Sequence, residues 1–156
     1  MIEYGKRDRR GRAISLREIR DDCKRVADIA PKDDQRQFVP ALAARYLLLS
    51  DREGVWKSLV VYADQDVVGH VMWARDTDGS YWMGGLLVDQ SEQRLGVGRS
   101  TVETLFVWLS EKSDCQMVRL SYHPANLAAE HLYSGLGFVA SGAMEGDEIV
   151  VERASR

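Results

Sequence analysis

A glycine-containing turn is the part of the chain whose residue types and spacing most clearly suggest chemistry. The turn reads Gln93-x-x-Gly96-x-Gly98 and lies between an apolar run, Leu86-Leu87-Val88, and a helical pattern that starts near Arg99. Two glycines let the backbone turn tightly with its amide groups exposed. A helix start adds N–H groups without partners and the positive end of the helix dipole. These features predict a phosphate-binding corner, although glycine pairs also occur at turns that bind nothing.

Two better-known phosphate loops do not fit this turn. A nucleoside triphosphate loop would place Lys-Ser or Lys-Thr after the last glycine, where this chain has Arg99-Ser100. A dinucleotide fingerprint would require glycine or alanine at position 99. Both ligand classes are therefore excluded at this turn.

A second motif follows within the stretch from Leu120 to Phe138. Its residues are Asn126, Ala129, Leu132-Tyr133 and Gly137-Phe138. In their order and separation, the two motifs resemble those of the GNAT superfamily, the acyl-CoA-dependent N-acetyltransferases. The resemblance covers Val55 to Glu152, and it implies that an acetyl group passes from acetyl-CoA to a primary amine, with CoA as the other product.

The secondary structure expected from sequence patterns agrees with this resemblance. Alternating apolar and polar residues predict strands, and apolar residues at spacings of three and four predict helices. The expected order is strand 13–18, helices 21–30 and 41–49, strands 58–63, 67–74 and 81–88, a helix after Gly98, strand 117–122, helix 126–135, and a hairpin of strands 138–140 and 149–152. This order predicts an α+β fold, with a mixed, mainly antiparallel twisted sheet of about seven strands and helices on both faces.

The resemblance also implies how the cofactor binds. The pyrophosphate of CoA should lie on the amides of the glycine turn, and the pantetheine arm should pair with the strand before it as if it were an added strand. Arginine and hydroxyl side chains beside the turn can add contacts to phosphate. The predicted cofactor-binding residues are Leu86, Leu87, Val88, Gln93, Arg94, Leu95, Gly96, Val97, Gly98, Arg99, Ser100, Asn126 and Tyr133.

Catalysis requires a donor for the carbonyl oxygen, an acid and a base. Gly84-Gly85 predicts a β-bulge over residues 84–86 that frees a backbone amide for the thioester carbonyl. Tyr133 matches the family's tyrosine, and a neutral phenol can protonate a departing thiolate of similar basicity. Many relatives carry an acidic residue on the strand before the turn, but this chain has none there. The general base is therefore His123, His70 or a water chain.

Length and composition fit one globular domain. The chain has 156 residues, of which 45% are hydrophobic and 29% charged. We expect a flexible basic arm over residues 1–12 and a single domain over residues 13–156. The formal charge of −3 argues against nucleic-acid binding, and no apolar run is long enough to span a membrane. The cytoplasm is the default location, and the isolated Cys23 and Cys115 predict no metal site.

The acceptor amine is less well defined than the cofactor. Gln37-Phe38-Val39 and the ending around Glu145-Gly146 resemble diamine and polyamine acetyltransferases, and Asp33 and Asp34 would attract a polycation. We therefore expect a small-molecule, polyamine-like amine, and the alternative is a catalytically silent acyl-CoA sensor. A homodimer could form if Ile149-Val150-Val151 pairs across a two-fold axis, but that strand could equally be core. Removal of residues 1–11 should leave acetyl-CoA binding intact.

Overall fold

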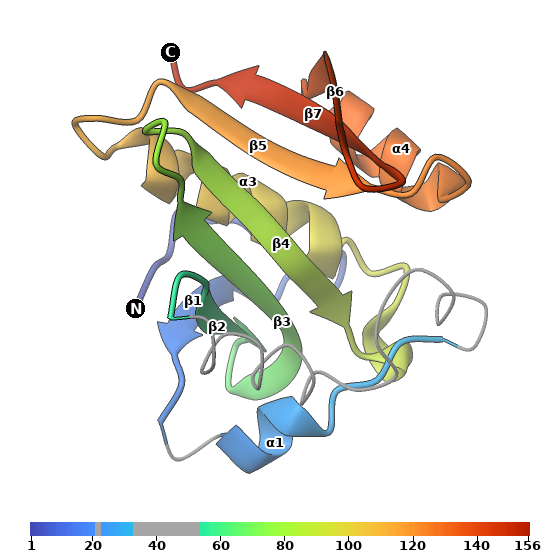
Figure 1. The fold of residues 1–156 in the computed structure, drawn as a ribbon. Helices are drawn as coiled ribbons and strands as arrows, with labels where there is room; N and C mark the ends of the chain where they lie inside the picture. Colours follow the sequence, from blue (N-terminus) through green and yellow to red (C-terminus); the bar gives the residue numbers. More distant parts are fainter. Residues whose placement is uncertain (21–22, 33–53) are drawn as a thin grey trace.

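Seven strands form one mixed sheet within residues 1–20, 23–32 and 54–156, the parts of the chain that this computed structural model describes (Figure 1). The strands are β1 (Ile14–Glu18), β2 (Lys57–Ala63), β3 (Asp66–Arg75), β4 (Tyr81–Val88), β5 (Met117–Tyr122), β6 (Val139–Glu145) and β7 (Glu148–Ala154). Their order in the sheet is β1-β2-β3-β4-β5-β7-β6, and β4 and β5 are the neighbours that run parallel. The helices are α1 (Cys23–Ala27), α3 (Val97–Ser110) and α4 (Leu127–Gly135), with a short 3-10 helix, η2 (Gln90–Glu92). The predicted fold class is confirmed.

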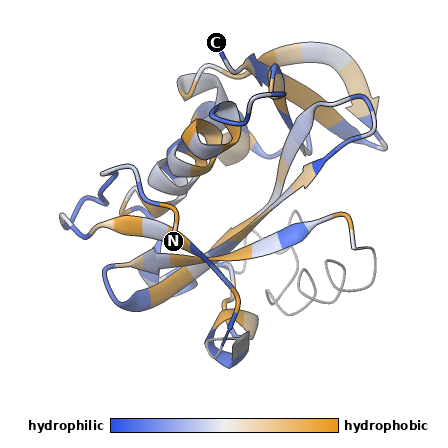
Figure 2. Cartoon of the chain, turned by 90° about the vertical axis from the view of Figure 1, so that its left-hand side faces the viewer, coloured by the Kyte–Doolittle hydropathy of each residue, from blue (hydrophilic) through white to orange (hydrophobic). Residues whose placement is uncertain are grey.

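Alternation along β2 explains why helices lie on both faces of the sheet. Leu59 and Val61 belong to the main core, together with Leu105 of α3, whereas Val60 packs with Val26 of α1. Successive side chains of a strand point to opposite faces, so α3 and α1 cover opposite sides. In Figure 2 the colours along α3 alternate between hydrophobic and hydrophilic, as expected for a helix with one buried face.

The predicted elements match the observed ones with shifts at their ends. β5 has the predicted bounds, and α3 begins at Val97 because Gly96 forms its N-cap in a left-handed conformation. α1 ends at Ala27, before the predicted residue 30, and β6 extends well beyond the predicted strand 138–140. The predicted helix 41–49 and the capping residues Asp21 and Asp22 lie outside the described residues.

The sequence left open whether the strand containing Ile149-Val150-Val151 is core or pairs across a two-fold axis, and the last hairpin of the structure answers this question. β7 lies between β5 and β6 and pairs antiparallel with both of them. Val150 and Val151 are buried, at 3% and 4% exposure. Since neither edge of β7 is free, this strand is part of the core and does not pair across a two-fold axis.

Residues 1–12, called the N-terminal segment from here on, make defined contacts with the rest of the chain. Ile2 exchanges backbone hydrogen bonds of 2.8 and 2.9 Å with Leu16 of β1. Asp8 is buried and accepts hydrogen bonds from Arg12, which also pairs with Glu92 beside the glycine turn. The expected frayed arm is thus corrected, because a buried carboxylate and backbone pairing hold this segment against the sheet.

β4 and β5 separate after a short region of pairing. Their parallel register joins Tyr81 to Val118 and Trp82 to Arg119 and does not continue beyond these two pairs. Figure 1 shows the two arrows diverging toward their carboxyl ends. Among the described strands, none pairs with the second half of β4 on the side of β5, so the backbone groups of this edge are available to a ligand.

Candidate active site

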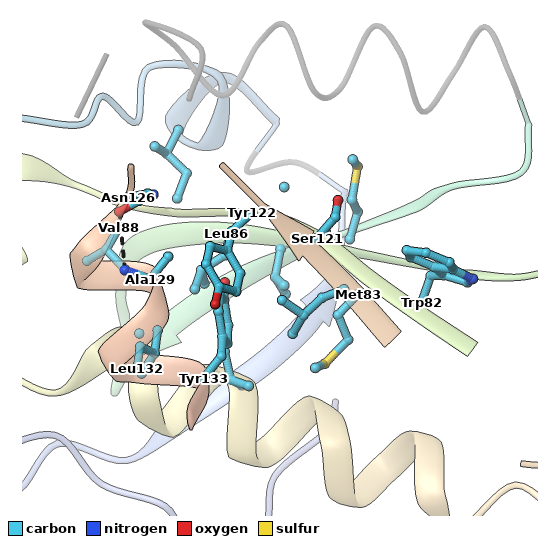
Figure 3. Close-up of a pocket in the computed structure, with 18 of the residues that line it drawn as sticks. Trp82, Met83, Leu86, Val88, Ser121, Tyr122, Asn126, Ala129, Leu132 and Tyr133 are labelled. Atoms are coloured by element: carbon cyan, nitrogen blue, oxygen red, sulfur yellow. Dashed lines mark hydrogen bonds between the residues drawn. The ribbon is translucent and has the colours of Figure 1, made fainter. Parts of the chain in front are cut away.

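A pocket of about 740 Å³ occupies the opening between β4 and β5. Its walls include the turn after β4, the start of α3 and one side of α4 (Figure 3). Most of the predicted binding residues line it, namely Leu86, Leu87, Val88, Gln93, Arg94, Gly96, Val97, Gly98, Asn126 and Tyr133. The fold thus brings the two sequence motifs to one cavity.

The glycine turn has the geometry of an anion-binding corner. Gly96 has a φ of 77° and forms the N-cap of α3, and Arg94 has a φ of 62°. The Gln93 side chain donates from Nε2 to the carbonyl of Val88 at 2.7 Å, which ties the turn to the end of β4. In the first turn of a helix, the N–H groups of residues such as Val97 and Gly98 have no partner within the helix. These amides and the helix dipole favour a negatively charged group at this end of the pocket.

Three predicted binding residues lie outside the pocket lining. The Ser100 hydroxyl donates to the carbonyl of Arg7 at 2.9 Å, and its N–H bonds to the carbonyl of Gly96 at 3.1 Å. Both donors of Ser100 are therefore used within the protein, which corrects the prediction of a phosphate-binding hydroxyl. Arg99 lies beside Glu103, with Nε 3.5 Å from the carboxylate, and Leu95 packs against the main core.

The β-bulge expected in β4 is present. His70 pairs with Leu87 and Met72 pairs with Gly84, so Gly85 and Leu86 together stand opposite a single residue of β3. Gly85 has a φ of 58°, a conformation that residues with a Cβ rarely adopt. An extra residue in one strand interrupts the ladder, and Gly85 and Leu86 line the pocket at that point.

Tyr133 and Asn126 come from the same helix, α4. Figure 3 shows Asn126 at the start of the helix and Tyr133 reaching from it toward Leu86. The Asn126 side chain caps the helix, since its Oδ1 accepts from the N–H of Ala129 at 3.2 Å. The Tyr133 ring tilts against Tyr122 with 5.9 Å between centroids, so packing fixes the direction of its phenol.

The two histidines considered as bases have different environments. His70 is fully buried, and burial lowers its pKa from 6.5 to about 4. Its ring nitrogens lie 2.7 Å from the carbonyl of Gly85 and 2.9 Å from the Ser58 hydroxyl, so neither nitrogen is open to a substrate. His123 lines the pocket, but its Nδ1 accepts from the N–H of Ala125 at 3.1 Å, and its Nε2 lies 3.6 Å from Asp147. This geometry favours a water chain over either histidine as the base.

Glu148 is a pocket residue that sequence reasoning missed. It lies on β7, and its Oε1 accepts from the Ser121 hydroxyl of β5 at 3.1 Å. Since Tyr122 packs toward Tyr133, its neighbour Ser121 points to the opposite face of β5, as Figure 3 shows. Glu145 of β6 also lines the pocket. The predicted carboxylates Asp33 and Asp34 and the stretch Gln37–Val39 lie outside the described residues.

No local signal in the sequence links Glu148 to the site. The two partners are 27 residues apart and meet through the pairing of β5 with β7. The register of this pair places Ser121 opposite Val150, and Glu148 lies two residues before Val150 on the same face of β7, so a register assignment would have made the two side chains diagonal neighbours.

Two further observations concern residues 1–20, 23–32 and 54–156. Within them, no group of three or more His, Cys, Asp or Glu side chains is placed to hold a metal ion. None of the helices found there has the length and apolar character needed to cross a membrane.

Comparison with known families agrees with the geometry of the site. The family described as "Acetyltransferase (GNAT) family" matches residues 13–138 of the chain. Among proteins of curated function, none matches the sequence.

Solved structures share the fold at low sequence identity. An aminoglycoside acetyltransferase, AAC(6')-Ib, in complex with coenzyme A is 18% identical, with a TM-score of 0.75 over 91% of this chain and 95% of that chain. The GNAT domain of S. lividans PAT is 15% identical, with a TM-score of 0.74 over 97% and 96% of the two chains. RimJ of Mycobacterium smegmatis, in complex with CoA-disulfide, is 15% identical, with a TM-score of 0.67 over 95% of this chain and 84% of that one.

Proposed function

The chain belongs to the acetyltransferase (GNAT) family, and on that premise we propose that it transfers an acetyl group from acetyl-CoA to a primary amine of a small molecule. Both substrates are bound together, and the transfer is direct. The observation that carries this proposal is that the glycine turn, the open edge of β4 and Tyr133 line one pocket.

The proposed cofactor site follows the pocket from the turn to the middle of β4. The pyrophosphate of CoA lies on the amides at the start of α3, where Arg94 can add a charge-assisted contact. The pantetheine arm lies along Leu86–Val88 and bonds to their backbone as an added strand would. The separation of β4 from β5 supports this placement, because no strand in the described part of the chain pairs with that edge of β4.

The proposed chemistry uses one backbone donor and one phenol. The amine nitrogen attacks the thioester carbon, a C–N bond forms and the C–S bond breaks. An amide of the bulge at Gly85–Leu86 stabilises the negative charge that develops on the carbonyl oxygen. Tyr133 gives its proton to the departing thiolate of CoA, and the proton lost by the amine passes through water and reprotonates the Tyr133 phenolate.

The acceptor amine approaches from the face of the sheet that carries Ser121. Glu148 and Glu145 line the pocket there, so the site offers carboxylates to a cationic amine even though β4 has none. Trp82 lines the same pocket and gives the acceptor an apolar contact. This arrangement favours a cationic amine with an apolar body, and a polyamine-like amine is one such acceptor.

A panel of amines offered with acetyl-CoA tests the proposal. We expect release of the free CoA thiol with at least one small cationic amine, and mass spectrometry should show the N-acetylated product. A shift in melting temperature with CoA, but no thiol release with any amine, would instead favour the acyl-CoA sensor.

A further inference from the structure

His70 holds the bulge of β4 from the neighbouring strand. We propose that His70 is a positioning residue that orients the Gly85–Leu86 peptide, so that the Leu86 N–H faces the pocket as the donor to the thioester carbonyl. This inference rests on the proposed function and assigns to a buried histidine a role in the same reaction.

The contacts of His70 fix its hydrogen positions. The ring is fully buried on β3, with Nδ1 2.7 Å from the carbonyl oxygen of Gly85 and Nε2 2.9 Å from the Ser58 hydroxyl. A carbonyl oxygen only accepts, so Nδ1 carries the hydrogen and donates it to Gly85. Nε2 then accepts from the Ser58 hydroxyl. Two strands, β2 and β3, thus hold one peptide group of β4.

The geometry of the peptide bond determines what this contact does. In a planar trans peptide the carbonyl oxygen and the following N–H point in opposite directions. Because the Gly85 carbonyl points at His70, the Leu86 N–H points away from it. His70 lies on β3, on one side of β4, and the pocket reaches the opposite edge of β4, where no described strand pairs with it beyond Trp82. The Leu86 N–H is therefore directed toward the space in which the acyl group would lie.

The bulge explains why a side chain is needed for this purpose. Gly85 and Leu86 stand opposite a single residue of β3, so the regular ladder does not fix both of their peptides. The ring of His70 replaces the missing ladder contact. Its approach is close, since a Cβ on Gly85 would lie 3.1 Å from His70 Cε1 and 3.0 Å from Met72 Cγ. Glycine at position 85 and histidine at position 70 are thus parts of one arrangement.

Two substitutions of His70 separate positioning from general stability. The amide nitrogen of asparagine takes about the place of Nδ1, so His70→Asn keeps a donor for Gly85. The amide nitrogen of glutamine takes about the place of Nε2. His70→Gln therefore keeps the Ser58 contact and loses the Gly85 contact. Both variants bury a polar amide, which makes them a matched pair.

The infrared band of acetyl-CoA labelled with 13C at its carbonyl provides a direct measurement. A hydrogen bond from Leu86 weakens the C=O bond, so the band should move to lower frequency when acetyl-CoA binds to the unmodified protein. His70→Asn should retain most of this shift and of kcat. His70→Gln should lose the shift, and its kcat should fall on the order of 10²-fold, as is typical when one such donor is lost. Its Kd for CoA should stay unchanged, because the phosphate contacts are distant.

A further variant controls for a general loss of stability. Val68→Ala, a buried change on β3 away from Gly85, should lower the melting temperature and leave the carbonyl band in place. If His70→Gln does not fold, His70→Leu replaces it with the same expectation. The same band and kcat in folded His70→Asn and His70→Gln would overturn the inference. So would a bound thioester without any shift in the unmodified protein, whereas turnover with an amine would still support the proposed acetyl transfer.

Discussion

Tyr133 is the side chain on which the proposed proton transfer depends. It lines the pocket, and its ring packs between two aromatic neighbours, with centroid distances of 5.9 Å to Tyr122 and 6.1 Å to Phe138. Tyr122 also lines the pocket, and burial followed by the charge of Glu130 raises its pKa. Two phenols therefore lie side by side, and the proposed acid is Tyr133.

Replacing each phenol separately tests that assignment. Tyr133→Phe should lower kcat by about 10²-fold or more, because general acid catalysis typically contributes that much. The Kd for CoA should change little, since the ring and its packing remain. Tyr122→Phe is the matched control and should keep most of kcat, as measured by thiol release. Equal losses in the two variants, or none in Tyr133→Phe, would remove Tyr133 from the acid role.

The buried His70 predicts a dependence of stability on pH. Burial lowers its pKa from 6.5 to about 4, against an opposing effect of the hydrogen bond to Gly85. Between these values the unfolded chain binds a proton that the folded protein does not. The contribution is therefore fully present above about pH 6.5, and about 3 kcal/mol is lost as the pH falls to about 4. Melting temperatures from pH 7 to pH 4 should fall more steeply for the unmodified protein than for His70→Asn. Equal slopes in the two proteins would contradict this prediction.

At the scale of elements, the turn between β4 and α3 is the proposed link between the sheet and the cofactor. Gln93 ties the turn to β4, and the N-terminal segment supports it from the other side. The Arg9 N–H donates to the carbonyl of Leu95 at 2.7 Å, and its side chain donates to the carbonyl of Arg94 at 2.9 Å. The amides proposed to bind the phosphate are thus held by contacts on the far side of the turn.

A pair of glycine substitutions separates backbone strain from cofactor binding. Gly96 in the turn and Gly79 in the β3–β4 hairpin both have positive φ, 77° and 85°. Alanine at either position should cost about 1–2 kcal/mol of stability. Only Gly96→Ala should also weaken CoA binding, by about 10-fold, because it re-aims the amides at the start of α3. Equal CoA affinity in Gly96→Ala and Gly79→Ala, measured by calorimetry, would argue against binding at this turn.

The contacts of the N-terminal segment predict that its removal weakens CoA binding, whereas the sequence alone suggested that binding would stay intact. Deleting residues 1–11 removes the Arg9 contacts to the turn and the Asp8 partner of Arg12. The deletion should lower the melting temperature and weaken CoA binding. Arg9→Gln should weaken binding in part, whereas Arg10→Gln, a neighbouring exposed charge, should not. Unchanged binding after the deletion would restore the original expectation.

At the scale of the whole molecule, local sequence patterns predicted the fold and the motif residues. Contacts that depend on pairing between distant segments could not be predicted in this way. The bounds of β5 and the bulge at Gly85 follow from alternation and glycine chemistry, which act over a few residues. The contact between Ser121 and Glu148 depends on the register of two strands that are distant in the sequence. The basic composition of the N-terminal segment indicated a frayed arm, but the pairing of Arg12 with Glu92, 80 residues away, is not visible in a local window.

Amide hydrogen exchange in the presence of CoA tests the central claim most directly. The claim is that the glycine turn and the free edge of β4 hold the cofactor in one continuous pocket. Addition of CoA should slow exchange at residues 84–88 and 96–99 and leave β1 and β2 unchanged. Protection of β1 and β2 instead, or no protection at the turn under conditions where CoA binds, would contradict the account.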